Sequence, residues 1–394
     1  MATICYYSAA GDDLALLAEA AGRLSHASHT VVGRSGNQLN DPAEAAWFAS
    51  TAARASAIIW HGETADAYAW QLIERTLDDR RAQHLPLPWV HLQPASGAAC
   101  VPPAGNPYAS GVTDGSWARL AELLATGGLE NLITALAIIV NRANDGCWPV
   151  PLPLPMPAWA LSHPDAGTFT SLAGYRPRLL PERPTVAVAY PRSHWLSHNT
   201  AHIDSLVHEL EYRGANVLPF FYPGEPQSGR DQQNIQQAFD RLCSDHDQPV
   251  ADAMISVNDT VDPTDDDWAS LPYPQIGVPV LRAVTSTIPR EKLSSTSADG
   301  PLADSVPWGV SAWPGRDGRL ATPVIACQET IDADALTGAR VPRLVPITGS
   351  AQALAVSALS WVGMSQSGRR LRALHPASGP QTDHTYSRTE QLAG

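Results

Sequence analysis

Three histidines spaced four residues apart are the side chains in this chain whose pattern first suggests chemistry. On one continuous helix this spacing would place His194, His198 and His202 along a single face, as three imidazole ligands for a metal ion. Asn199 and Thr200 form a helix-start signature, so His194 and His198 are expected in the preceding loop and only His202 on the helix. The favoured interpretation is that the histidines lie in the loop and on the helix surface and bind no metal. If a metal site exists, these three histidines are its candidate ligands.

The same loop carries a second kind of candidate site. Arg192, Ser193, His194, Asn199 and Thr200 crowd the carboxyl end of one predicted strand and the start of the helix that follows it. Ligands bind at this place in open α/β sheets, and a helix N-terminus favours anionic groups. The alternative is that these residues only cap the helix and fix the loop.

The elements that must position this loop alternate between strand and helix. Residues 185–190, 216–222, 253–257 and 278–284 are strand-like runs, and residues 200–213, 231–243 and 351–362 have helical periodicity. Gly214 stands where a C-cap glycine belongs, so residues 185–222 are expected to form a right-handed βαβ unit. The second half of the chain is therefore predicted to be a parallel α/β domain.

The first half shows the same alternation. Strand-like runs at 3–7, 57–60 and 88–92 are interleaved with helical patterns at 14–24 and 65–83, and two more helices are expected at 116–126 and 129–142. Asp12 or Asp13 is a natural N-cap for the first helix. Prolines at alternating positions from 149 to 157 forbid helix and sheet ladder, which predicts a stiff extended connector.

The predicted fold class is thus α/β, with two successive parallel-sheet domains, a Pro-rich connector and a disordered tail. The predicted boundaries are 1–147 for the first domain with its helical end, 148–183 for the connector, 184–364 for the second domain and 365–394 for the polar tail.

Composition excludes several classes of function. A net charge of −13, from 39 acidic and 26 basic residues, argues against binding to a nucleic-acid backbone. Five scattered cysteines without a C-x-x-C motif, and no apolar run long enough to cross a bilayer, predict a cytoplasmic protein with reduced thiols. Neither of the glycine-rich phosphate-binding motifs, G-x-x-x-x-G-K-S/T and G-x-G-x-x-G, occurs in the sequence, so the chain is not expected to bind ATP by itself.

Two further features have structural interpretations. The acidic run of Asp259, Asp262, Asp265, Asp266 and Asp267 lacks the spacing of a calcium loop and is expected to be a solvated loop. Cys327 lies in an apolar run without a local histidine partner, which indicates core packing rather than nucleophilic catalysis.

Residues 184–206, with the run R-S-H-W-L…N-T, and the continuation L-E-Y-R-G-A-N-V-L-P-F at 210–220 resemble the CobN family, relatives of the magnesium chelatase H subunit. Shorter pieces match in the same order, from Leu124-Ala-Thr-Gly-Gly-Leu-Glu-Asn-Leu to Glu329. Glu329 joins Arg192, His194, Asn199 and Thr200 as a candidate substrate-binding residue. Family members are much longer, and their chelation chemistry is attributed to the part downstream.

The resemblance implies an ATP-dependent cobaltochelatase, a ligase that forms nitrogen–metal bonds during cobalamin biosynthesis. This chain would be a truncated CobN-like head that helps to bind a tetrapyrrole of the hydrogenobyrinic acid a,c-diamide type, holding one of its carboxylate or acetamide side chains at the Arg192 loop. Cobalt and ATP would be used by the complete complex, with AAA+ chelatase subunits (CobS/CobT-like) and a separate C-terminal CobN polypeptide as partners. No cofactor bound by the chain alone and no catalytic residue are predicted.

Two alternatives stay open at this point. The chain could be a free-standing tetrapyrrole-binding or carrier protein without chelatase activity, or an inactive truncated product.

Overall fold

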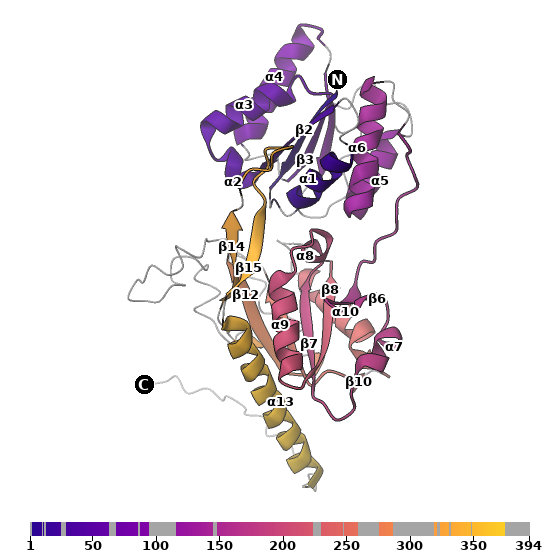
Figure 1. The fold of residues 1–394 in the computed structure, drawn as a ribbon, viewed down its shortest axis with the longest axis vertical. Coiled ribbons are helices and arrows are strands. Elements are labelled where there is room, and N and C mark those ends of the chain that lie inside the picture. The colour runs from indigo at the N-terminus through magenta and orange to yellow at the C-terminus, as the bar shows by residue number, and fades with distance from the viewer. Residues whose placement is uncertain are drawn as a thin grey trace, which may run out of the picture.

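The computed structural model describes residues 2–9, 11, 13–24, 29–62, 68–85, 87–93, 116–144, 148–223, 230–246, 248–258, 276–286, 319–320, 324–330, 332–347 and 349–374. They form two α/β layers stacked along the long axis of the molecule (Figure 1). The predicted α/β class and its parallel sheets are confirmed.

The first layer is a four-stranded parallel sheet in the order β2-β1-β3-β4. Residues of β1 alternate between two cores because successive side chains point to opposite faces. Helices α1, α5 and α6 cover one face, and α3 and α4 cover the other. The elements are β1 (Ala2–Ser8), α1 (Leu14–Arg23), β2 (His29–Ser35), α2 (Gly36–Leu39), α3 (Pro42–Ala52), β3 (Ala57–His61), α4 (Tyr68–Ala82), β4 (Trp89–Gln93), α5 (Ser116–Thr126) and α6 (Leu129–Asn144).

At the carboxyl end of this sheet, Asp13 occupies the N-cap position of α1 without capping it. No side-chain cap bond forms; Asp13 Oδ2 instead accepts a hydrogen bond from the Tyr6 hydroxyl and lies 3.1 Å from His61 Nδ1. Burial raises the pKa of Asp13, but hydrogen bonding and charge from His61 outweigh it, so the pKa lies below its ordinary value. Burial, followed by the charge of His61, lowers the pKa of the nearby His91 to about 4.

The connector is shorter than the stretch from 148 to 183. Residues 148–157 are neither helix nor strand, and they lie against α6 through two asparagines. Asn141 exchanges two hydrogen bonds with the backbone of Trp148, and Asn131 exchanges two with that of Leu154. Side-chain amides thus supply the hydrogen bonds that a proline-rich backbone cannot take from a sheet.

The second layer is a nine-stranded sheet in the order β15-β14-β12-β11-β7-β8-β5-β6, with β13 paired to β12. The strands β7, β8, β11, β12 and β14 are parallel, and the hairpin β5-β6 and the edge strand β15 are antiparallel. The strands are β5 (Ala160–His163), β6 (Gly167–Phe169), β7 (Thr185–Pro191), β8 (Asn216–Tyr222), β11 (Ala253–Asn258), β12 (Val280–Ser286), β13 (Arg319–Leu320), β14 (Val324–Thr330) and β15 (Pro342–Pro346).

Helices cover both faces of the second sheet. One core contains residues of α9 and α13, and the other contains residues of α7 and α10. The remaining elements are α7 (Leu172–Tyr175), the 3₁₀ turn η2 (Arg176–Arg178), α8 (Arg192–Leu196), α9 (Ala201–Tyr212), α10 (Arg230–Leu242), β9 (Ser244–Asp245), β10 (Gln248–Pro249) and α13 (Ser350–Leu374).

Helix α13 continues to Leu374, ten residues into the polar tail that was predicted to start at residue 365. The arginines near this end, at 369, 370 and 372, are good helix formers and favour a helix C-terminus, which explains the extension. Residues 375–394 lie outside the described part of the chain. Among the described residues, no helix is long and apolar enough to span a membrane.

Residues 334–341 tie the second layer back to the first, where β14 and β15 reach towards β2 (Figure 1). The backbone N–H of Gly33 donates to the Thr337 carbonyl at 3.0 Å. The Gln38 side chain donates to Gly338 O and accepts from Arg340 N, at 3.1 and 2.9 Å. Ala339 is fully buried in the core of the first layer. The two layers are therefore joined both by the connector and by this return segment.

Candidate functional site: a pocket at the junction of the two layers

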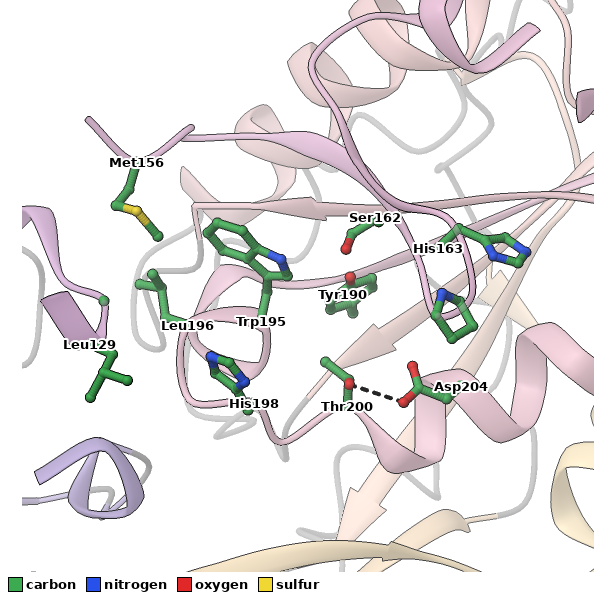
Figure 2. Close-up of a pocket in the computed structure, with 13 residues that line it drawn as sticks. Leu129, Met156, Ser162, His163, Tyr190, Trp195, Leu196, His198, Thr200 and Asp204 are labelled. Atoms are coloured by element: carbon green, nitrogen blue, oxygen red, sulfur yellow. Dashed lines mark hydrogen bonds between the residues drawn. The ribbon is translucent and has the colours of Figure 1, made fainter. Parts of the chain in front are cut away.

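A pocket of about 360 Å³ lies where the turn between α5 and α6, the connector and the carboxyl end of β7 meet (Figure 2). Segments far apart in the sequence contribute to it. Its lining consists of Gly128, Leu129, Met156, Ser162, His163, Pro164, Gly167, Tyr190, Trp195, Leu196, His198, Thr200 and Asp204.

The β7-α8-α9 segment supplies the floor of the pocket. β7 ends at Pro191, α8 makes little more than one turn, and the chain reverses at His198, whose φ is +57°. Trp195 is held by a parallel stack on Phe221 of β8, with ring centroids 4.4 Å apart. Thr200 is the N-cap residue of α9; its hydroxyl donates to Asp204 Oδ2 at 3.1 Å and accepts no capping hydrogen bond from the helix backbone.

The apolar wall depends on two glycines in the turn between α5 and α6. Gly127 and Gly128 have φ values of +74° and +88°, which favour glycine. A Cβ atom on Gly127 would lie 3.1 Å from a methyl carbon of Leu196, and one on Gly128 would lie 3.1 Å from Met156 Cε. Glycine at both positions therefore lets α6 begin in close contact with α8 and the connector.

The opposite wall is polar. Ser162, Tyr190, Thr200 and Asp204 present oxygen atoms there (Figure 2). Burial raises the pKa of Asp204 and the charge of Asp165 adds to this rise, against the hydrogen bond from Thr200 and the charges of His208 and His163, which lower it. The pocket is thus amphipathic, which suits a ligand with an apolar ring and polar substituents.

Arg192 is not among the residues that line the pocket, and its guanidinium makes two structural hydrogen bonds. Its Nε donates to Pro157 O at 2.8 Å, and its Nη2 donates to Thr126 O at 3.0 Å. Thr126 is the last residue of α5, so the guanidinium caps that helix and holds the connector at the same time. Burial lowers the pKa of Arg192.

The three histidines are not gathered into one site. His194 lies on α8 rather than in a loop, and its buried ring meets that of the buried His202 edge to face, with centroids 5.2 Å apart. His198 is exposed at the pocket rim, because the reversal at this residue breaks the continuous helix that a stack would need. Across the described residues, no three His, Cys, Asp or Glu side chains lie close enough to hold a metal ion.

The other candidate residues divide between the pocket and the surrounding structure. Thr200 lines the pocket, whereas Asn199 lies beside it and accepts a hydrogen bond from Leu344 N of β15 at 2.9 Å. Glu329 lies on β14, exposed, and is not among the residues that line the pocket. Cys327 is fully buried on β14, as expected for core packing. The acidic run at 259–267 lies outside the described residues.

The sequence pattern pointed to Thr200 but to none of the other residues of the polar wall. Asp204 stands on the first turn of α9, so the same topological rule that selected Thr200 would also have selected it. Tyr190 is the penultimate residue of β7 and could have been found in the same way. Ser162 and His163 gave no signal, because their hairpin fell within the predicted connector.

The sequence pattern of the CobN/Magnesium Chelatase family matches residues 121–374, about two thirds of the chain. Among solved structures, the catalytic subunit of cobaltochelatase from Mycobacterium tuberculosis superposes with a TM-score of 0.59 at 22% identity. That match covers 93% of this chain but only 28% of the longer protein. The E. coli ADP-heptose LPS heptosyltransferase II covers 93% of this chain and 100% of its own, but its TM-score of 0.22 at 10% identity relates no fold. No curated protein matches the sequence.

Proposed function

Because the chain belongs to the CobN/magnesium chelatase family, we propose that it is a CobN-like head subunit that helps to bind a tetrapyrrole for cobalt insertion in cobalamin biosynthesis. The ligand is of the hydrogenobyrinic acid a,c-diamide type. The observation that carries this proposal is the amphipathic pocket at the junction of the two layers.

The size of the pocket limits what it holds. At about 360 Å³ it is at the lower end of the range of roughly 300–1,000 Å³ for small-molecule sites. It has room for one edge of a macrocycle with its substituents, not for the whole ring. Trp195, Leu129 and Met156 would contact the ring edge, while the oxygens of the opposite wall would bind polar substituents.

The rest of the macrocycle would be held by another polypeptide. The chain spans 28% of the length of the cobaltochelatase subunit that it superposes on. A separate C-terminal CobN polypeptide would supply the remaining walls and the catalytic residues, and AAA+ subunits (CobS/CobT-like) would hydrolyse ATP. Cobalt is then a substrate of the complete complex, which works in the cytoplasm, and this chain binds neither ATP nor a resident cofactor alone.

Titration of hydrogenobyrinic acid a,c-diamide, followed by its absorbance spectrum, tests the proposal on the chain alone and with the C-terminal polypeptide. We expect the absorbance spectrum to shift on titration, with a lower dissociation constant when both polypeptides are present. Ser162→Phe, which fills the pocket, should weaken binding by about tenfold or more, which is about 1.4 kcal/mol. Ser357→Phe, on the exposed face of α13, is the matched control.

Each other outcome has a definite meaning. No spectral shift with either preparation refutes tetrapyrrole binding. If the chain alone binds the tetrapyrrole tightly and the second polypeptide leaves the dissociation constant unchanged, the chain is instead a free-standing carrier.

A further inference from the structure

The pocket has a carboxylate but no guanidinium or ammonium group among its described lining residues. Asp204 lines the pocket, and Asp165 is close enough to affect the pKa of Asp204. Arg192, which follows β7 at the floor of the pocket, donates hydrogen bonds to the carbonyls of Thr126 and Pro157. An anionic ligand group would therefore enter this site without a fixed cation to receive it.

The buried histidine of the lining does not supply that cation. His163 Nδ1 accepts a hydrogen bond from the backbone N–H of Asp165 at 3.1 Å. Its Nε2 lies 3.0 Å from Glu211 Oε1. Both ring nitrogens are thus engaged within the protein, and the partner of Nε2 is itself a carboxylate. His198, the other histidine of the lining, is exposed at the rim.

Asp204 retains one acceptor for a ligand. Its Oδ2 receives the hydrogen bond from Thr200, and its Oδ1 receives none within the described part of the chain. Figure 2 shows this second oxygen on the side of Asp204 that faces Ser162 and His163. The hydroxyls of Ser162 and Tyr190 belong to the same polar wall and can both donate and accept, with Ser162 Oγ also 3.3 Å from Thr168 Oγ1.

We propose that Asp204 makes this pocket selective for macrocycle side chains that end in a primary amide over the same side chains ending in a carboxylate. This inference rests on the proposed function of the pocket. An amide NH₂ donates to Asp204 Oδ1, and the amide oxygen accepts from another hydroxyl of the same polar wall. A carboxylate has no proton to donate and is repelled by the like charge of Asp204.

The pair of ligands that tests this is hydrogenobyrinic acid a,c-diamide and hydrogenobyrinic acid, which has free carboxyls at the same two positions. Both are titrated at neutral pH against the chain together with the C-terminal polypeptide. We expect the diamide to bind about tenfold or more tightly, since hydrogen bonds to charged groups are among the stronger ones.

Asp204→Asn keeps the shape of the side chain and removes its charge. It should bring the ratio of the two dissociation constants close to one, chiefly by tightening the binding of the free acid. Glu182→Gln removes one carboxylate from an exposed position near the amino end of β7, away from the pocket, and should leave the ratio unchanged. Circular dichroism of each variant confirms that it is folded.

The outcomes separate this inference from the proposed function. Equal binding of the two ligands by the unmodified chain, or a ratio that Asp204→Asn leaves unchanged, refutes the selectivity while tetrapyrrole binding stands. Failure of both ligands to bind refutes the proposed function and the selectivity with it.

Discussion

Arg192 should act as a clamp between the two layers rather than as a ligand-binding residue, and substitution separates the two roles. Arg192→Met keeps most of the aliphatic length but removes both hydrogen bonds, to Thr126 O and Pro157 O. A hydrogen bond from a charged donor contributes roughly 1.5–3 kcal/mol. Because the side chain is only partly buried, we expect a total loss of about 2–4 kcal/mol in the free energy of unfolding.

Urea denaturation followed by tryptophan fluorescence measures this loss. Arg192→Lys places a single ammonium group that reaches only one of the two carbonyls at a time, so it should recover about half of the lost free energy of unfolding. The exposed Arg183 provides the control Arg183→Met, expected to stay within about 0.5 kcal/mol of the unmodified chain. If Arg192→Met unfolds like the unmodified chain but loses affinity for a free-carboxylate ligand, Arg192 binds the ligand and the clamp is refuted.

Three further predictions concern stability. Acidification from pH 6.5 to 4 should lower the free energy of unfolding by about 3 kcal/mol through His91, because its pKa of about 4 keeps it neutral in the folded chain while it becomes protonated in the unfolded chain. His91→Gln should remove this loss. Melting temperatures that fall in parallel for both proteins across that pH range contradict the prediction. Asp13→Asn should cost about 1–2 kcal/mol at pH 7, a difference that shrinks as acid protonates the carboxylate of low pKa; a difference that grows on acidification reverses the assigned sign. Gly128→Ala should cost about 1–2 kcal/mol in urea denaturation, because φ is +88° and the new methyl meets Met156; the control Gly363→Ala, on α13 with open space at its Cβ position, should not destabilise the chain.

The regular elements were predictable where one pattern dominates. The strand at 216–222 and the helix at 116–126 have the predicted bounds, because an apolar run or a helical repeat is closed by glycine or a polar turn. The helix Pro42–Ala52 was not predicted, since alanine fills much of it and gives little contrast between its faces. The hairpin β5-β6 was missed because it follows the proline run and its strands are short.

Two residues of the candidate loop line the pocket, and its arginine has partners that the sequence does not reveal. Topology alone located the loop after β7, where Thr200 and His198 do line the pocket. The partners of Arg192 are 66 and 35 residues away in the chain, and nothing in the local pattern shows that two carbonyls will lie there. The guanidinium of Arg192 caps α5, and Asp204 supplies the one carboxylate among the residues described as lining the pocket.

The pocket walls come from residues near 128, 156, 162 and 200, so the pocket exists only while the connector and the turn between α5 and α6 are seated on α8. Asn131 and Arg192 hold these segments together by hydrogen bonds to the backbone of Leu154, Pro157 and Thr126. A ligand that binds only the assembled junction must stabilise it, by about 2.7 kcal/mol at a concentration one hundred times its dissociation constant. Destabilising the junction must in turn weaken the binding of the ligand, because the two equilibria are linked. Arg192→Met should therefore lower the affinity for amide and carboxylate ligands by the same factor, whereas Asp204→Asn changes their ratio. Position and charge are thus separable contributions to one site.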